Sequence, residues 1–398
     1  MTDTTTTNDV KDIDYQTDRY LVRQYVSRIL TRFPRYRDDA RWTELRGDDL
    51  FGSPLLDLPV ELGHRCRGLW HGGVEREDVP PLRRLIAKIE EECGRTPCPE
   101  GILRRNLLAL AHELKLPDEA LEVLTFQLAA ALYEPVQALV GRGDLAPSEK
   151  LLLIAAATVM SPDAVRTLLS GGSPLVEAGL LEADGCGPRG LPEVGLPERL
   201  KKALTSPHAE PGDVLSFAAR RDRLPALPLE AFNHLKPWPE VARRCLVAAD
   251  SRGRGLNVLV HGPGGAGKTT LARSLARAAR LELFSPPQEE SPGPYKNYDS
   301  IQLAFAVLRR RGHGALLMDP GFFASERKPT VGCPELHFLL DHPGVQVLWT
   351  APTPDALHPD FLRRFDLVLA LPEPAEPWTR PVWEDLLTPD ERASLGIL

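Results

Sequence analysis

The stretch that decides the fold reads Asn257-Val-Leu-Val-His-Gly-Pro-Gly-Gly-Ala-Gly-Lys-Thr-Thr270. It starts as an apolar run, continues as Gly-x-x-x-x-Gly-Lys-Thr, and passes into the helical pattern Leu271-Ala-Arg-Ser-Leu-Ala-Arg277. A strand, a glycine-rich turn and a helix in this order direct backbone N–H groups at an anion, and the helix dipole favours the same charge. The stretch therefore predicts a site for nucleotide phosphates.

The side chains of this loop have separate roles. Lys268 can reach the β- and γ-phosphates, and the Thr269 hydroxyl is placed to ligate Mg²⁺. The alternative is a glycine-rich turn without a ligand, but such a turn needs neither the Lys-Thr pair nor the preceding strand. We expect the nucleotide to contact Gly262, Pro263, Gly264, Gly265, Ala266, Gly267, Lys268, Thr269 and Thr270.

The Mg²⁺ ion needs a carboxylate from the end of a neighbouring buried strand. Ala315-Leu-Leu-Met-Asp319 fits this need, because four apolar residues are followed by an acid. A buried parallel strand presents such an acid at its carboxyl end, where ligands of open α/β sheets bind. Two further apolar runs, residues 345–350 and 367–371, complete the predicted parallel sheet. Thr269 and Asp319 are thus the predicted metal ligands.

Residues 224–372 resemble the AAA+ ATPase family. The resemblance rests on the P-loop, on the strand that ends in Asp319, and on residues 355–366, which end in Arg-Arg-Phe-Asp before the last strand. It implies an α/β P-loop NTPase fold of the AAA+ type with a parallel sheet. It also implies ATP and Mg²⁺ as cofactors and a homo-oligomer assembled through the nucleotide domain. Residues 224–235 look like the family's linker into that domain.

The same resemblance implies an arginine finger, which reaches the γ-phosphate held by a neighbouring subunit. Arg364 or Arg363 is the matching residue. A guanidinium at that place stabilises charge on the transferring phosphoryl group. The alternative is a pair of surface arginines favoured by the dipole at a helix end. With Lys268 and Asp319, the two arginines make up the predicted catalytic set.

Three positions depart from the family's pattern. Pro320 follows Asp319 where the family has a glutamate that polarises the attacking water, and the nearest downstream acid is Glu326. The family's polar sensor falls among residues 350–352, where only a threonine hydroxyl remains. Residues 373–398 are expected to be a short tail in place of a full helical lid. We therefore expect ATP binding and leave turnover open, since loss of a water-activating base typically costs about a hundredfold to ten-thousandfold in rate.

The N-terminal half is predicted to be mostly helical. Residues 1–18 are rich in Thr and Asp and are expected to form a disordered tail, followed by a helical region over residues 19–145. Residues 146–223 resemble a winged-helix module, with three helical patterns and a Gly-rich turn at 184–190. The first helix has an apolar face made of Leu21, Val22, Tyr25, Val26, Ile29, Leu30 and Phe33.

The distribution of charge indicates which kind of partner the chain favours. Between residues 148 and 202, six Lys and Arg stand against seven Asp and Glu, whereas a reader of DNA grooves should be basic. A protein client is therefore favoured, and DNA is kept as a less favoured partner. The whole chain of 398 residues has a formal charge of −7, which argues against a protein that mainly coats nucleic acid but leaves room for a local basic patch.

Two functions fit these features. The first is an oligomeric ATPase, or an ATP-gated remodeller of a protein or nucleoprotein partner. The second is a non-hydrolysing nucleotide switch or scaffold with an N-terminal module that binds a partner.

A membrane span or a signal peptide in the sequence would indicate the cellular location. No run approaches the ~18 apolar residues of a membrane span, and the first residues lack the positive flank and apolar core of a signal peptide. We expect a cytoplasmic protein with no membrane span. The six cysteines do not predict a disulfide framework, and Cys93-x₄-Cys98 is wider than the commonest zinc knuckles, so reduced thiols are expected.

Overall fold

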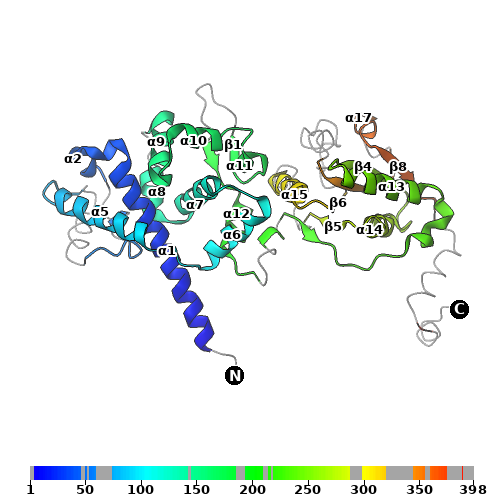
Figure 1. Ribbon diagram of the computed structural model, residues 1–398, viewed down its shortest axis with the longest axis horizontal. Coiled ribbons are helices and arrows are strands. Elements are labelled where there is room, and N and C mark those ends of the chain that lie inside the picture. Colours follow the sequence, from blue (N-terminus) through cyan, green and yellow to red (C-terminus); the bar gives the residue numbers. More distant parts are fainter. Residues whose placement is uncertain are drawn as a thin grey trace. The chain divides into compact units, whose positions relative to one another are not determined.

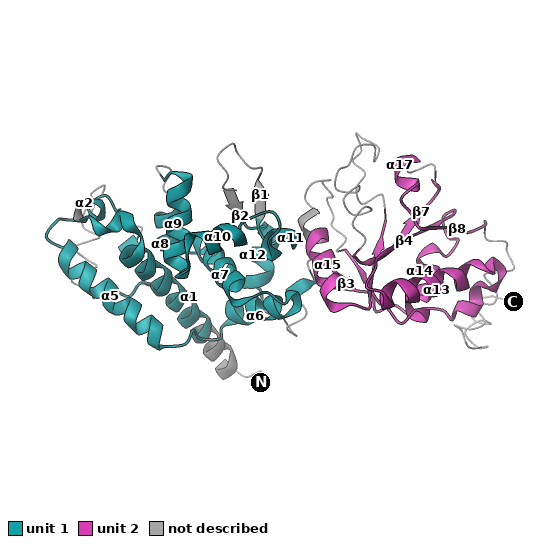
Figure 2. Ribbon diagram, turned by 45° about the horizontal axis from the view of Figure 1, so that its top comes forward, with its two compact units in different colours: residues 1–217 teal, residues 218–398 magenta. Residues whose placement is uncertain are grey.

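The computed structural model describes residues 4–45, 50–51, 53–59, 74–141, 145–184, 193–208, 214–216, 218–286, 298–319, 344–354, 359–373 and 388. The chain divides into two compact units, residues 1–217 and residues 218–398 (Figure 2). In their described parts, the first unit is mainly helical and the second contains a six-stranded sheet.

Unit 1 is built around its long first helix, which packs against five of the helices that follow it (Figure 1). The expected apolar face of this helix is confirmed, because its seven residues are at most 2% exposed. The elements are α1 (Thr4–Arg32), η1 (Pro34–Arg37), α2 (Asp39–Trp42), α5 (Val79–Arg95), α6 (Ile102–Leu114), α7 (Asp118–Leu132), α8 (Glu134–Val140), α9 (Pro147–Thr158), α10 (Pro162–Leu168), α11 (Pro174–Glu177), β1 (Glu182–Asp184), β2 (Glu193–Gly195) and α12 (Glu198–Thr205).

The N-terminal segment differs from the expected disordered tail, because α1 already begins at Thr4. Two α1 side chains cap the start of α6. The Thr17 hydroxyl accepts a hydrogen bond from the Gly101 amide (2.9 Å), and the Asp14 carboxylate accepts one from the Ile102 amide (2.6 Å). These amides stand at a helix N-terminus, where the helix itself supplies no acceptor. Contacts with residues far along the chain thus hold residues 14–17 in place, and local composition cannot show such contacts.

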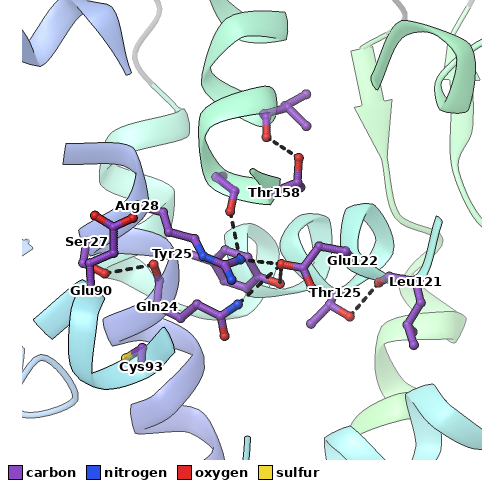
Figure 3. A network of polar contacts seen from close by, with 12 residues as sticks. Gln24, Tyr25, Ser27, Arg28, Glu90, Cys93, Leu121, Glu122, Thr125 and Thr158 are labelled. Atoms are coloured by element: carbon purple, nitrogen blue, oxygen red, sulfur yellow. Dashed lines mark hydrogen bonds and ion pairs between the residues drawn. The ribbon is translucent and has the colours of Figure 1, made fainter. Parts of the chain in front are cut away.

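A partly buried polar network joins α1 to α7 and α9 (Figure 3). Arg28 donates through Nη1 to Oε1 of Glu122 (2.6 Å) and to the carbonyl oxygen of Ala157 (3.2 Å). The Tyr25 hydroxyl donates to the same carboxylate oxygen at 3.4 Å. Burial raises the pKa of Tyr25 well above its usual value, and the Glu122 carboxylate adds to that rise. One carboxylate therefore satisfies two polar groups of α1.

The elements predicted as a winged-helix module lie in the same compact unit as the helices before them, so the predicted division between residues 145 and 146 does not separate two units. Asn106 of α6 gives one reason, because its amide donates to the carbonyl oxygens of Leu204 (2.9 Å) and Ser206 (2.8 Å). β1 and β2 pair in antiparallel register, while residues 185–190 of the predicted turn lie outside the described residues. The winged-helix assignment stays a prediction.

Among the helices of the described ranges, none is by itself long and apolar enough to cross a bilayer. Two sharply bent pairs, α7 with α8 and α9 with α10, reach that length and composition only when each pair is taken together.

Unit 2 contains a sheet in the order β3-β5-β6-β7-β4-β8. Every neighbouring pair of strands is parallel except β3 with β5. The four apolar runs predicted as strands are β4, β6, β7 and β8, so the predicted parallel sheet is confirmed, while β3 and β5 have no counterpart in the prediction. The strands are β3 (Arg220–Arg221), β4 (Leu256–His261), β5 (Glu282–Ser285), β6 (Gly314–Met318), β7 (Gln346–Ala351) and β8 (Leu367–Ala370).

Helices cover both faces of this sheet (Figure 1). They are η3 (Leu229–Leu235), α13 (Trp238–Ser251), α14 (Lys268–Ala278), α15 (Tyr298–Arg311) and α17 (Pro359–Leu362). Successive strand residues point to opposite faces. Accordingly, Trp349 packs in one core with Phe305 of α15 and Phe361 of α17, whereas Leu348 packs in the other with residues of α13 and α14. Burial on both faces is what a parallel sheet requires.

Unit 2 begins at residue 218 rather than at the predicted 224, because β3 belongs to its sheet. Arg220 lies opposite Ser285 and Arg221 lies opposite Phe284, in antiparallel register. Two residues suffice for this pairing, and so short a strand carries no pattern of its own. At the other end, residues 374–387 and 389–398 of the predicted tail lie outside the described residues.

Candidate functional site

The loop between β4 and α14 has the conformation that its glycines predict. Gly265 and Gly267 have φ angles of +78° and +85°, in the left-handed region that other residues rarely adopt. A Cβ atom on Gly262 would lie 2.6 Å from the carbonyl oxygen of Leu371, whereas a Cβ atom on Gly264 would meet nothing within 4 Å. The loop is therefore tightly packed where it leaves β4 and has open space at its middle.

Lys268 lies over this loop. Its Nζ donates to the carbonyl oxygens of Gly262 and Pro263, both at 2.8 Å. Lys268 is also the first residue of α14, with Gly267 as the N-cap. The first amides of a helix have no acceptor within it, and the dipole adds partial positive charge at this end. An ammonium group and a helix N-terminus thus converge on one loop, which is an arrangement that binds phosphate.

Asp319 lies at the same edge of the sheet as this loop. β6 ends at Met318, which pairs with Trp349 of β7, and Trp349 in turn pairs with Leu259 of β4. Asp319 therefore stands in register with Val260, two residues before the loop, with β7 between them. The hydroxyl of Thr269 and the carboxylate of Asp319 are oxygen ligands of the kind that Mg²⁺ prefers, and the ion keeps several waters. These two residues fit the predicted metal.

The other predicted catalytic elements are only partly described. Thr350 lies in β7, between the strands that carry the loop and Asp319, and is 8% exposed. It lies near the carboxyl end of β7, and its role as a sensor stays a prediction. Pro320 and the candidate base Glu326 fall outside the described residues, so the assignment of a base stays a prediction.

Arg363 and Arg364 lie near the opposite edge of the sheet. They precede Asp366, whose carboxylate accepts a hydrogen bond from the amide of Asn257 at 2.8 Å, near the start of β4. The five strand residues from there to Gly262 span about 16 Å. The Arg363 side chain is 80% exposed, whereas Arg364 is half-buried. The structure therefore brings the loop and Asp319 together and leaves both arginines away from them.

The segment that enters unit 2 is bonded to the helix that follows the loop. The Asp222 carboxylate accepts a hydrogen bond from Nε of Arg273 at 2.9 Å, and its side chain is only 5% exposed. One turn further along α14, Arg277 donates through Nη1 to the carbonyl oxygen of Ala226 (2.9 Å). These residues are missing from the sequence-based prediction. The spacing of two arginines four residues apart is the signal that could have indicated a polar contact on one face of α14.

His261 is another residue that the prediction omits. It ends β4 directly before the loop and pairs with Ala351 of β7 and Ala370 of β8. Burial lowers the pKa of His261 below its usual value of 6.5, so the imidazole is neutral at pH 7. Its place between an apolar strand and the first loop glycine is the only sequence signal for it. A neutral hydrogen-bonding ring thus adjoins the loop without adding charge.

Comparison with known proteins gives matches in structure alone. No family model matches the chain, and no curated protein matches its sequence. The AAA domain of FIGL-1 in complex with ADP is 19% identical with a TM-score of 0.34, and the match covers 46% of this chain and 68% of that chain. A HORMA, CdnC and Trip13 complex from E. coli is 17% identical with a TM-score of 0.31, covering 43% of this chain and 74% of that chain.

A third match is a katanin structure, described under the words "Structural Basis for Katanin Self-Assembly". It is 18% identical with a TM-score of 0.34, and it covers 46% of this chain and 65% of that chain. The geometry of unit 2 stands independently of these matches: a parallel sheet with helices on both faces, a Gly-x-x-x-x-Gly-Lys-Thr loop between β4 and α14, and an acid after β6. Unit 2 therefore has an α/β fold with helices on both faces of a mainly parallel sheet and a P-loop between β4 and α14.

Proposed function

We propose that unit 2 binds Mg·ATP and that the protein is an oligomeric ATPase or an ATP-gated remodeller of a protein partner. The observation that carries this proposal is the convergence of the Lys268 ammonium group and the N-terminus of α14 on one glycine-rich loop. Asp319 at the same sheet edge supports a metal beside the phosphates. The even charge balance of residues 148–202 favours a protein as the partner.

Each residue of the site has a defined role in this proposal. The loop amides and Lys268 hold the phosphates, and Thr269 and Asp319 hold Mg²⁺. The bound metal supplies electrostatic stabilisation of the phosphoryl group in transfer. Thr350 offers a hydroxyl at the sensor position. The water-activating base is unassigned, with Glu326 as the nearest downstream acid.

Arg363 is the better placed of the two finger candidates. An arginine that acts across a subunit interface must be exposed, and the Arg363 side chain is 80% exposed. Arg364 is half-buried, and its amide donates to the carbonyl oxygen of Phe361 at 3.0 Å. Because both lie about 16 Å along the sheet from the loop of their own chain, the proposed finger acts on the site of a neighbouring copy.

The deciding experiment measures phosphate release across a range of protein concentrations, with ATP binding measured in parallel. Lys268→Ala provides the blank, and we expect it to lose both binding and release. Release per subunit should rise with concentration if neighbouring copies complete the site. Arg363→Ala should keep ATP binding and lose at least tenfold in release, whereas Arg364→Ala should lose less. Failure of the wild type to bind ATP would refute the nucleotide site itself.

A non-hydrolysing nucleotide switch is the second candidate. Two observations favour it: the threonine at the sensor position, and the Asp222–Arg273 pair, which ties the helix after the loop to the segment leading from unit 1. This function predicts ATP-dependent assembly, measured by light scattering, with phosphate release no faster than that of Lys268→Ala. That result would reject the enzyme and keep the nucleotide site.

A further inference from the structure

A second charged surface lies at the edge of the sheet opposite the loop. The amino ends of parallel strands share one edge, so the turns that enter β4, β5 and β6 lie there together. We call these turns, residues 252–254, 280 and 309–313, the basic edge. Its basic side chains are all exposed: Arg252, Arg254, Arg280, Arg309, Arg310, Arg311 and His313.

Contacts between the turns hold this surface together. The His313 ring lies 2.6 Å from the carboxylate of Asp250 at the end of α13, joining the turn before β6 to the turn before β4. The carbonyl oxygen of His313 accepts a hydrogen bond from the Glu282 amide of β5 (2.8 Å). Arg309 packs over Gly344, where an added Cβ atom would lie 2.9 Å from the arginine Nε. The charges therefore stand on fixed backbone turns.

The described part of the basic edge remains positive after its acids are counted. Among the residues that the structure describes, the acids at this edge are Asp250, Glu282 and Asp366, and each has a partner: His313, Arg221 (2.7 Å) and the Asn257 amide, respectively. Three helices end here. The dipole of each helix acts like roughly half a negative charge at its C-terminus and therefore favours a cation there. That preference accounts for about one arginine per helix and not for six.

The chemistry of the basic edge fits phosphates. All its permanently charged groups are guanidinium groups, whose planar fork matches phosphate oxygens in pairs. From β5 to β4 the edge crosses three strand spacings, about 14 Å, which equals about four phosphates along one strand of a duplex at 3.4 Å each.

The basic edge lacks the apolar anchors of a protein interface. The exposed large apolar residues described in unit 2 are Leu224, Trp238, Val247 and Val368, and none lies in the three turns. We propose that the basic edge binds the phosphate backbone of a nucleic acid. In the sequence, DNA is the less favoured partner because of the charge balance of residues 148–202 and the net charge of the whole chain. Neither quantity describes this surface.

The test is fluorescence anisotropy of the full-length protein with a labelled 20-base-pair duplex at 50, 100 and 200 mM salt. The wild type should bind with a steep salt dependence, with a slope of log K against log salt of about −4 to −5 for four to six phosphate contacts. Replacing Arg252, Arg254 and Arg280 together by Gln should weaken binding at least tenfold at 100 mM salt. It should also make the slope shallower by about 3, at roughly 0.9 per contact.

The matched control removes three exposed charges from α5 of unit 1: Arg84→Gln, Lys88→Gln and Arg95→Gln. It should bind the duplex as the wild type does. Both triple variants should keep the thermal midpoint and the ATP affinity of the wild type, which excludes misfolding as the cause.

Three results would overturn the proposal: no binding by the wild type, equal losses in both triple variants, or displacement of the duplex by poly-glutamate as effectively as by unlabelled duplex. The last result would assign the basic edge to an acidic protein.

Discussion

Nε of Arg273 donates to a carboxylate oxygen of Asp222 at 2.9 Å, and the acid is only 5% exposed. The arginine belongs to the helix that starts at the P-loop, and the acid belongs to the segment that leads into the sheet. A charge pair with so little access to water is fixed in geometry, because either partner alone would be a poorly solvated charge. The start of unit 2 and α14 therefore move together.

Arg273→Ala should lower the free energy of unfolding by about 2–4 kcal/mol, because it leaves the Asp222 carboxylate buried without its partner. Arg277→Ala is the control, since it removes a single hydrogen bond to a backbone carbonyl and should cost about 0.5–1.5 kcal/mol. Denaturant unfolding monitored by circular dichroism distinguishes the two. If Arg273→Ala together with Asp222→Ala is no more stable than Arg273→Ala alone, the uncompensated charge is not the cause.

Gly262→Ala should destabilise unit 2 by about 1–3 kcal/mol, because the added Cβ atom meets the Leu371 carbonyl oxygen at 2.6 Å. Gly264→Ala adds the same methyl group where nothing lies within 4 Å, and it should change stability by less than about 0.5 kcal/mol. It should nevertheless weaken ATP binding, since the methyl group enters space that the proposal gives to phosphate. Thermal unfolding and isothermal titration with ATP test the pair, and equal destabilisation by both would contradict the described loop.

Glu122→Gln should lower the free energy of unfolding by about 1–3 kcal/mol, because the side chain loses the charge that Arg28 contacts at 2.6 Å. Their side chains are 22% and 28% exposed, so water screens the pair only in part. Glu91→Gln is the control, since its pair with Arg95 lies on the exposed surface of α5 and should contribute at most about 1 kcal/mol. A larger loss in the control would refute the special role of the network in Figure 3.

The lowered pKa of His261 predicts that the stability of the folded protein depends on pH. Its folded-state pKa lies below the usual 6.5 because of burial, so between the two values the unfolded chain binds more protons. Stability from this residue is therefore fully present above pH 6.5 and is lost as the pH falls through the folded pKa. His261→Asn should flatten the fall in melting temperature between pH 7.5 and 5. His234, whose pKa burial also lowers, should contribute in the same direction, and His234→Asn should show a separate, additive flattening.

Local patterns predict the nucleotide site and four of the six strands. β4, β6, β7 and β8 are short apolar runs, and the loop is defined by its own residues. β5 has only Leu283 and Phe284 as apolar residues, and β3 exists only as a partner of β5, so neither has a local pattern. The helical order of α1 at residues 14–17, inside the predicted tail, is supported by the caps that these residues give to α6. Such long-range contacts are invisible in a single sequence.

For the arginines, too, the local motif predicts the residues, whereas long-range packing decides their positions. The motif before β8 identifies Arg363 and Arg364 as candidates, but their exposure depends on how α17 packs, and their separation from the loop depends on strand register. The Asp222–Arg273 pair joins residues whose side chains meet only in the folded sheet. The basic edge likewise arises because parallel strands gather three separate turns.

β8 is held at both ends. At its carboxyl end, the Leu371 amide donates to the carbonyl oxygen of His261 (2.8 Å), and the Leu371 carbonyl leaves no room for a side chain at Gly262. At its amino end, Asp366 bonds to Asn257, just after the two finger candidates. β8 is about 13 Å long. The loop after β4 lies at its carboxyl end, and the two candidate arginines precede its amino end. If copies assemble as proposed, β8 links the loop of one subunit to the arginine that the same subunit offers to its neighbour, so a shift of the loop has a direct route to the next site.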